Sequence, residues 1–425
     1  MRTFWFCVRT SRPFLGLIPL FVTMVCAPAQ PPSTPLADRP LRLADCLAIS
    51  EERQPSLAVG RARLAAAQSR LASLESIKGP AARLRNDLII RKQQARLGVE
   101  TEQLNLTRLQ IENRYVVTRS YLSVLYARAQ RKILDNLIEE LTFLRERVRV
   151  SVKNKERPEW SAATVDLITL YLKRAEARRA EAERGAAMAL ASVREGLALE
   201  PAVCLNIADE PIPQPRVHVC REEILATALA RRSEVIGSSL VSQSAALETE
   251  AQDAYCRRNV FHTFAAGSDL HAHPVPQPIY GDNFRPGGIP LAMPAILAGP
   301  RPGRVETAQN HSIEARAVAE KTRNLVLLEA EEAYYGWEEW SKKVGYLAEA
   351  QKIGTRLASE LHAEYRGSLK RLIDALLPES LLAAQAYTDY NEALFRQAVA
   401  LAALERVTAG GFCAALANAP DPLKP

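Results

Sequence analysis

Apolar residues recur at helical spacing over two long stretches of the chain, and neither stretch contains a proline. In the first, from 81 to 157, successive apolar positions are three or four residues apart: Leu122, Leu125, Ala129, Ile133, Leu137, Leu141, Leu144 and Val148. This spacing places the side chains in one stripe along a helix. After a break at 154–158, a second helix is predicted from 161 to 195, and Gly196 ends it. The pattern therefore predicts a long antiparallel helical hairpin.

The second stretch shows the same arrangement. No proline lies between Pro302 and Pro378, and apolar spacing predicts a helix from about 305 to 366. Such a helix would be roughly 90 Å long at about 1.5 Å per residue. Gly367 interrupts the pattern, and another helix is predicted from 381 to 407. Because helices of this length exceed what a globular domain of this size needs, they predict a rod or part of a coiled-coil wall.

A shorter helical pattern precedes each long hairpin. The first begins at Leu43 and is interrupted at Pro55, and it aligns with the segment around Ile224 at an offset of 178. Further on, Tyr121 aligns with Tyr334 at an offset of 213. The chain is therefore predicted to be an internal duplication, and the difference between the offsets 178 and 213 places 35 extra residues in the second half.

The extra residues lie between 257 and 304, where the composition changes to aromatic residues, glycine and proline. This composition between two helices predicts an irregular β-hairpin, although Pro290 and Pro294 weaken its second strand because proline cannot donate to a ladder. In the first half only residues 87–90 resemble a strand. The hairpin of the first repeat is therefore predicted to be reduced or absent.

The N-terminus has the three-part pattern of a secretory signal, with basic residues, an apolar run from 14 to 25, and small residues before a cleavage site after Ala29. Cys26 leaves lipid attachment open as an alternative. The predicted organisation is a signal peptide over 1–29, a flexible arm over 30–42, a first helical repeat over 43–200, a linker over 201–220, a second repeat over 221–410 with a β-hairpin insertion at 257–304, and a tail over 411–425.

Charge and cysteine content exclude some classes of function. The formal net charge of +7 includes three arginines in the predicted signal, so +4 remains, too weak and dispersed to indicate nucleic acid binding. The five cysteines after the signal fit no metal-ligand spacing. Cys204 and Cys220 flank a proline-rich linker, and in an oxidising compartment they either form a disulfide or remain two free thiols.

No arrangement of residues indicates catalysis. The six histidines are scattered, and His271 and His273 have no carboxylate or cysteine at ligand spacing. The sequence also lacks a phosphate-binding glycine loop, a nucleophile elbow and a CxxC motif. The sequence therefore predicts neither an enzyme nor a cofactor or metal site. Helices with one apolar stripe cannot bury it alone, so the pattern predicts assembly into a symmetric oligomer.

Several short segments, in this order, resemble the TolC-like outer-membrane efflux proteins. They are Leu43 to Ala48 with Gln54 to Leu57, Pro294 to Ala308, Glu332 to Tyr334, Tyr365 to Gly367, Leu381 to Gln385, Tyr390 to Ala393, and Leu404 to Arg406. The resemblance covers nearly the whole chain after the predicted signal. It implies a mainly α fold of duplicated long antiparallel helical hairpins that form an α-barrel coiled coil, with a small β-hairpin segment that contributes to a trimeric β-barrel.

The same resemblance implies a function. Members of the family are homotrimeric channels of the outer membrane, with most of the chain in the periplasm, and they serve tripartite efflux or type I secretion with a periplasmic adaptor and an inner-membrane pump. It implies a passive conduit whose adaptor-docking tips are at Asn154, Lys155, Gly367 and Ser368. Asn154, a residue type that tolerates left-handed backbone geometry, takes the place of the family's tip glycine in the first half. Asp374 is a candidate for a pore constriction.

One departure from the family leaves an alternative open. Because the first half lacks the hairpin, a trimer would offer about six good strands rather than twelve, and a sheet in lipid must close with its edges satisfied. Either residues 77–91 supply short strands, or the membrane barrel is reduced. The remaining possibility is a non-conducting periplasmic coiled-coil structural or adaptor protein, and closure of the barrel separates it from a channel.

Overall fold

The computed structural model describes residues 39–79, 86–155, 160–254, 300–364 and 377–418, together with the backbone of six short strands between 260 and 299. Helices make up most of the described residues. In the first half they are α1 (Leu43–Arg53), α2 (Pro55–Ser76), α4 (Leu88–Lys153) and α5 (Ala162–Gly196). In the second half they are α6 (Arg221–Arg231), α7 (Ser233–Ala254), α8 (Arg301–Glu364) and α10 (Leu377–Val407), with a short 3-10 helix η3 (Leu416–Asn418) near the end.

The two halves repeat the same sequence of helices. Helices α1 and α6 both have 11 residues, α2 and α7 both have 22, α4 and α8 have 66 and 64, and α5 and α10 have 35 and 31. The first two pairs begin 178 residues apart and the third pair 213 apart. These are the offsets found in the sequence, so the periodicity that predicted long helices also located their counterparts.

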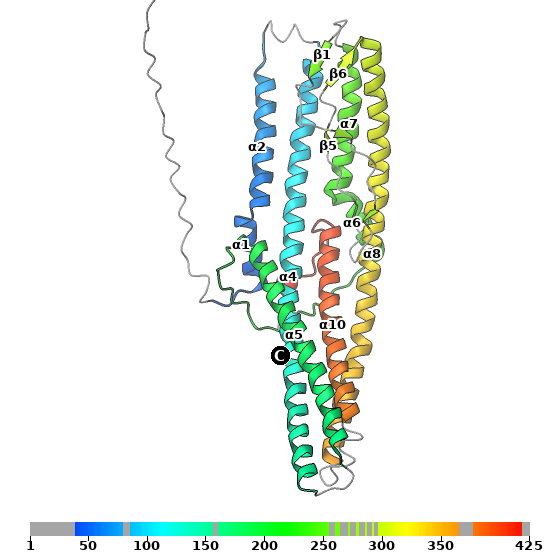
Figure 1. The fold of residues 1–425 in the computed structure, drawn as a ribbon. Helices are drawn as coiled ribbons and strands as arrows, with labels where there is room; N and C mark the ends of the chain where they lie inside the picture. Colours follow the sequence, from blue (N-terminus) through cyan, green and yellow to red (C-terminus); the bar gives the residue numbers. More distant parts are fainter. Residues whose placement is uncertain are drawn as a thin grey trace, which may run out of the picture.

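The long helices lie side by side along one axis (Figure 1). Helix α4 spans about 100 Å at about 1.5 Å per residue and packs against α2 and α7 over its first half and α5 and α10 over its second half. Helix α8 packs against α7 and then α10. The molecule is therefore a wall of four helices, in the order α2, α4, α7, α8 near one end and α5, α4, α10, α8 near the other.

The main core lies at mid-length, where shorter segments wrap the long helices. It includes Tyr121 and Leu122 on α4, Leu401 and Leu404 on α10, and Ile207 in the connection between the halves. That connection, predicted as a linker, is fixed in place. The Leu41 N–H donates to Asn206 O at 2.7 Å and the Ala208 N–H donates to Leu41 O at 2.9 Å, while Arg128 Nη1 donates to Ile207 O at 2.8 Å.

Six short strands lie between α7 and α8 as three nested antiparallel pairs. They are β1 (Val260–Thr263) with β6 (Ile296–Gly299), β2 (His271–Ala272) with β5 (Leu291–Ala292), and β3 (Pro278–Ile279) with β4 (Arg285–Pro286). In the first pair Val260 lies opposite Gly299 and Thr263 opposite Ile296. The described backbone of this segment therefore forms a single hairpin that runs out and returns once, and strands β2, β4 and β6 contact α8.

The strand suggested for residues 87–90 is wrong. Leu88 begins α4, with its own side chain buried and that of Ile89 73% exposed. Arg91 Nε donates to Asp87 Oδ2 at 3.1 Å, an i, i+4 contact that only a helical turn provides. The short run of apolar residues after Asp87 resembled a strand because a run of this length cannot be distinguished from the first turn of a helix. Among the described helices, none has the length and apolarity needed to cross a bilayer.

Candidate functional site

The helical wall has two edges that we call uncovered because no further long helix among the described residues packs on them, although α6 and strands β2, β4 and β6 contact α8. Helix α8 forms one edge, and α2 and α5 form the other, and within the described residues α8 makes no extensive contact with either. Large apolar side chains are exposed on both edges, including Tyr346 (71%) on α8 and Leu170 (56%) and Met188 (59%) on α5. A single copy therefore leaves large apolar side chains in water on both edges, which is typical of surfaces that bind another protein.

The first hairpin turns just after Lys153, at the far end of the wall from the strands (Figure 1). Asn154 and Lys155 are both exposed there. The expectation that Asn154 adopts left-handed geometry is wrong, because its φ is −82° and the left-handed residue is Lys155, at φ 53°. The Asn154 N–H still donates to Val150 O at 3.0 Å, so the helix continues one residue further than the sequence alignment implied. Gly367, Ser368 and Asp374 lie outside the described residues.

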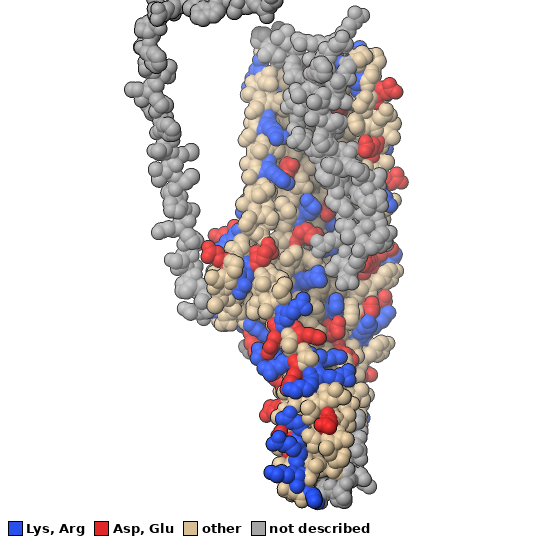
Figure 2. Space-filling view, viewed as in Figure 1, with Lys and Arg blue, Asp and Glu red and all other residues tan. Residues whose placement is uncertain are grey.

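The tip of the first hairpin is basic. Lys and Arg side chains line the narrow end of the molecule in Figure 2. Arg147, Arg149 and Lys153 are exposed in the last turns of α4, and Lys155 is exposed in the turn that follows. Among the described residues of this end of α4 the nearest acid is Glu146, whose carboxylate pairs with Arg149 at 3.1 Å. In the sequence, Glu156, Arg157 and Glu159 follow Lys155. A surface of this kind favours an acidic partner.

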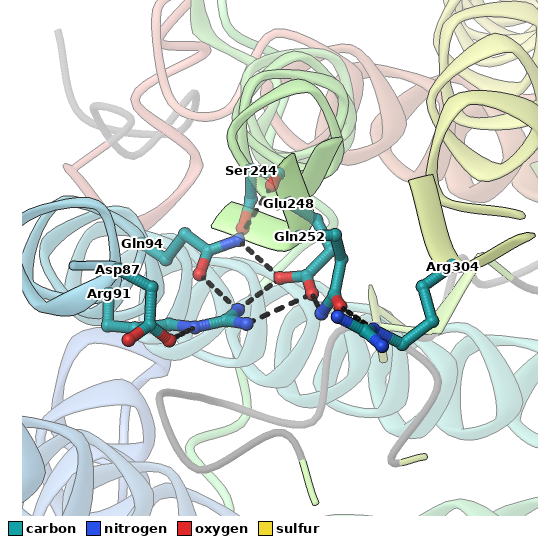
Figure 3. A network of polar contacts seen from close by, with 7 residues as sticks. All are labelled: Asp87, Arg91, Gln94, Ser244, Glu248, Gln252 and Arg304. Carbon is teal, nitrogen blue, oxygen red and sulfur yellow. Dashed lines mark hydrogen bonds and ion pairs between the residues drawn. The ribbon is translucent and has the colours of Figure 1, made fainter. Parts of the chain in front are cut away.

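A buried polar network joins three helices close to the strands (Figure 3). Arg91 on α4 pairs with Glu248 on α7 through two bonds, of which Arg91 Nη2 to Glu248 Oε1 is 3.1 Å. Gln94 Nε2 donates to Glu248 Oε2 at 3.0 Å and to Ser244 O at 3.0 Å. These side chains are at most 3% exposed. Because the guanidinium and the carboxylate satisfy each other, the network fixes α4 against α7.

The network continues to α8. Gln252 Nε2 donates to Glu248 Oε1 at 2.6 Å, and Arg304 Nε donates to Gln252 Oε1 at 2.9 Å. Arg304, near the start of α8, is fully buried. The helices that enter and leave the strand segment are therefore connected by buried hydrogen bonds, which hold the two ends of that segment at a fixed separation.

A second network lies at mid-length, where four helices meet. Glu329 on α8 pairs with Arg232 at 2.9 Å and with Arg406 on α10 at 2.7 Å, and Arg406 also reaches Glu112 on α4 at 3.1 Å. Burial lowers the pKa of Arg232, but the carboxylates of Glu234 and Glu329 outweigh it and hold that pKa above its ordinary value. Burial by itself would raise the pKa of Glu234. The charge of Arg232 and its hydrogen bond to Glu234 lower that pKa by more, so the pKa of Glu234 lies below its ordinary value of 4.5.

Neither network was found from the sequence. Glu248 and Glu329 are both 2% exposed, and nothing in their sequence neighbourhood predicted this burial. One signal was available: Arg91 and Arg304 are separated by 213 residues, the offset of the duplication, so an arginine occurs at the same place in both long helices.

The cysteines do not form the disulfide offered as one alternative. Cys204 and Cys220 are free thiols in the structure, and Cys220 Sγ donates to Glu222 Oε2 at 3.3 Å. Cys46 is fully buried, and burial raises the pKa of its thiol to about 12. Within the described residues, no three His, Cys, Asp or Glu side chains gather at a distance suited to a metal ion.

Solved structures of outer-membrane channels share this fold. The chain matches MtrE of Neisseria gonorrhoeae at 13% identity and TM-score 0.64, covering 87% of this chain and 89% of that one. It matches the channel OprN at 16% and 0.67, covering 87% and 90%, and VceC of Vibrio cholerae at 12% and 0.66, covering 87% and 97%. No family model matches the sequence, and no curated protein does.

The resemblance to TolC-like proteins is therefore confirmed at the level of the fold. The chain shares its mainly helical fold with the outer-membrane channels MtrE and OprN and with the outer membrane protein VceC over 87% of its length. At 12–16% identity the likeness concerns the arrangement of helices and carries no residue role with it.

Proposed function

We propose that this protein is the outer-membrane channel subunit of an export system, either tripartite efflux or type I secretion, and that substrate passes through it without chemistry. The observation that carries this proposal is the four-helix wall with two uncovered edges, in a fold shared with efflux channels. The two buried polar networks connect helices to one another instead of lining a catalytic pocket, and this is consistent with a channel.

The channel forms when copies of the wall close edge to edge. When two different edges join head to tail, copies of the chain form a ring if the rotation between neighbours closes on itself. The resemblance to the family implies that this ring is a homotrimer. The lumen then runs along the axis of α4 and α8, which would cross much of the periplasm at about 100 Å.

The membrane part is built from the segment between α7 and α8. Each copy contributes one set of nested strand pairs, and the first repeat, which joins α2 to α4 without a described strand, contributes none. The proposed barrel is therefore a reduced one, closed by the strand segments of all copies so that no backbone edge faces lipid. The Arg91–Glu248 network holds the base of each segment in place.

The opposite end of the wall docks a periplasmic adaptor that connects to an inner-membrane pump. Asn154 and Lys155 form the first docking tip, and Gly367 and Ser368 form the second, with Asp374 near a constriction of the pore. The basic flank of the first tip, at Arg147, supports an acidic adaptor surface. Export through a signal peptide over 1–29 places most of the chain in the periplasm.

A second candidate is a non-conducting periplasmic coiled-coil protein of the same fold. The observation that favours it is the single strand segment per chain, because it halves the strands available to a barrel.

The two candidates separate in planar bilayers. Purified full-length protein should give stable single-channel steps, and a variant lacking residues 259–300 should give none while keeping its helical circular dichroism and its oligomeric state. Absence of steps from correctly exported, folded and oligomeric wild-type protein would refute the channel and favour the coiled-coil protein.

A further inference from the structure

A groove lies over α4, between α5 on one side and α10 on the other. Both helices pack on α4, but among the described residues they make no extensive contact with each other. Small residues on α5, at Ala175, Ala182 and Gly185, leave this space open, and the groove has a volume of about 610 Å³. Sites for small molecules typically have volumes of about 300–1,000 Å³ and often lie between the helices of a bundle.

The floor of the groove is apolar. Leu134 and Leu137 on α4 line it together with Leu381 and Phe395 on α10. Leu134 is buried, whereas Leu137, Leu381 and Phe395 are only partly buried. A single copy therefore keeps a strip of apolar surface in contact with water, and an apolar chain that covered this strip would be stabilised by the hydrophobic effect.

Two exposed arginines of α5, Arg174 and Arg178, line the same groove. Among the described residues neither forms an ion pair, and the acid on the facing part of α4, Asp135, pairs with Arg179 instead, at 3.0 Å. The described lining includes one acid, Glu181. The groove therefore has an excess of positive charge, and both guanidinium groups are available to an anion.

Contacts between the helices show where along the groove these groups lie. Asp135 and Arg179 lie at the same level, because their side chains pair. Arg174 is five residues nearer the tip than Arg179, and Tyr126 is nine residues nearer mid-length than Asp135. At about 1.5 Å per residue, Arg174 and Tyr126 are about 20 Å apart along the wall. One end of the groove is thus cationic, and Tyr126 stacked on Phe395 at 4.7 Å forms the other.

We propose that this groove binds a long-chain fatty acid, with its carboxylate between Arg174 and Arg178 and its acyl chain over Leu134 and Leu137. The planar guanidinium group of arginine matches the two oxygens of a carboxylate, and a positive end with an apolar floor complements a molecule that has one charged head. A protein helix about 20 Å long and about 10 Å in diameter would need about 2.5 times the volume of the groove. The site lies within one copy, so its occupation does not depend on conduction.

A second groove, between α4, α10 and α8, has the same apolar character without the excess charge. Its volume is about 630 Å³, and it shares Ile133 and Leu137 with the first groove. Its described lining includes one cation, Lys132, and one anion, Glu140. Because these charges balance, a carboxylate should bind in the first groove in preference to the second.

Equilibrium dialysis with radiolabelled palmitate tests the site in full-length protein held in amphipol, where no detergent competes. Wild-type protein should bind palmitate saturably. Arg174→Gln combined with Arg178→Gln should weaken this binding about tenfold or more, because it removes the charge-assisted hydrogen bonds to the carboxylate. Binding of hexadecanol, which has the same chain without the charge, should be unchanged. The matched control is Arg184→Gln, which changes an exposed arginine of α5 outside the described lining and should alter neither affinity.

A second variant tests the apolar part of the site. A Cβ at Gly185 would meet no atom within 4 Å, so Gly185→Leu should fold normally and fill part of the groove. It should weaken binding of palmitate and hexadecanol alike, several-fold for each. Gly345→Leu, at an equally open and exposed position on α8, is the matched control and should leave both affinities unchanged.

Three results would overturn the proposal. One is the absence of saturable palmitate binding by wild-type protein that has its helical circular dichroism. Another is palmitate affinity that neither the arginine variant nor Gly185→Leu lowers, which would place the bound lipid elsewhere on the molecule. The third is equal weakening of palmitate and hexadecanol by the arginine variant, because the arginines would then not hold the carboxylate.

Discussion

At the residue scale, buried charged side chains join helices that belong to different halves of the chain. Glu248 lies between Arg91 and the Gln252–Arg304 pair, and Glu329 lies between Arg232 and Arg406. Removing one partner from such a pair leaves an unmatched charge in a buried site, which costs more free energy than the pair itself contributes. These residues therefore determine how the two repeats fit together.

Glu248→Ala should lower the free energy of unfolding by about 3–5 kcal/mol, because it strands the buried guanidinium of Arg91. Denaturant unfolding followed by far-UV circular dichroism measures this. The matched control on the same helix is Asp253→Ala, which removes an ion pair to Arg301 whose side chains are 63% and 46% exposed, and it should cost less than about 1 kcal/mol. Equal losses would show that the network contributes no more than a surface pair.

The Glu234–Arg232 pair should make stability depend on pH in the acid range. The pKa of Glu234 in the folded protein lies below 4.5, so the pair stabilises the fold fully above pH 4.5, and this contribution is lost as the pH falls through the folded pKa. Glu234→Gln should flatten the acid limb of a plot of unfolding free energy against pH. An unchanged acid limb would contradict the assignment.

At the element scale, the sequence predicted the helices well and the polar contacts between them poorly. Periodic apolar residues such as Leu122 and Leu141 are buried as predicted, because the 3.6-residue repeat depends only on neighbours along one helix. Glu248 could not be recognised as buried, because its burial depends on Arg91, 157 residues away. Residues 87–90 could not be recognised as the start of a helix for the same reason. Arg91, in the first turn of that helix, pairs with the distant carboxylate of Glu248.

The turn of the first hairpin illustrates a smaller error. The sequence placed the left-handed residue at Asn154, while the structure has it at Lys155. Left-handed geometry costs an ordinary residue about 1–2 kcal/mol, and one residue of helix extension is beyond what sequence alignment of two repeats resolves.

Lys155→Gly should therefore stabilise the hairpin by about 1 kcal/mol, since glycine carries no penalty at positive φ. Asn154→Gly, at φ −82°, is the matched control and should bring no such gain. Thermal unfolding of both variants measures the difference. Stabilisation by the change at 154 alone would place the left-handed residue there after all.

At the scale of the whole molecule, a single copy is one part of the proposed assembly. Its two edges expose large apolar side chains, its described strands form one hairpin, and its basic tip lies at the far end from strands β1 and β6. The proposed assembly, in which several copies form a tube between a membrane and a partner, gives each of these features a role. The outer-membrane channels MtrE and OprN share the fold at 13% and 16% identity.

The most direct measurement of this assembly is electron microscopy of the detergent-extracted full-length protein, with averaged views down the long axis. We expect a closed ring in which the four-helix walls of three copies surround an open lumen, with α8 of each copy beside α5 of the next. A solid helical bundle, or single copies with uncovered edges, would contradict the tube and with it the proposed channel.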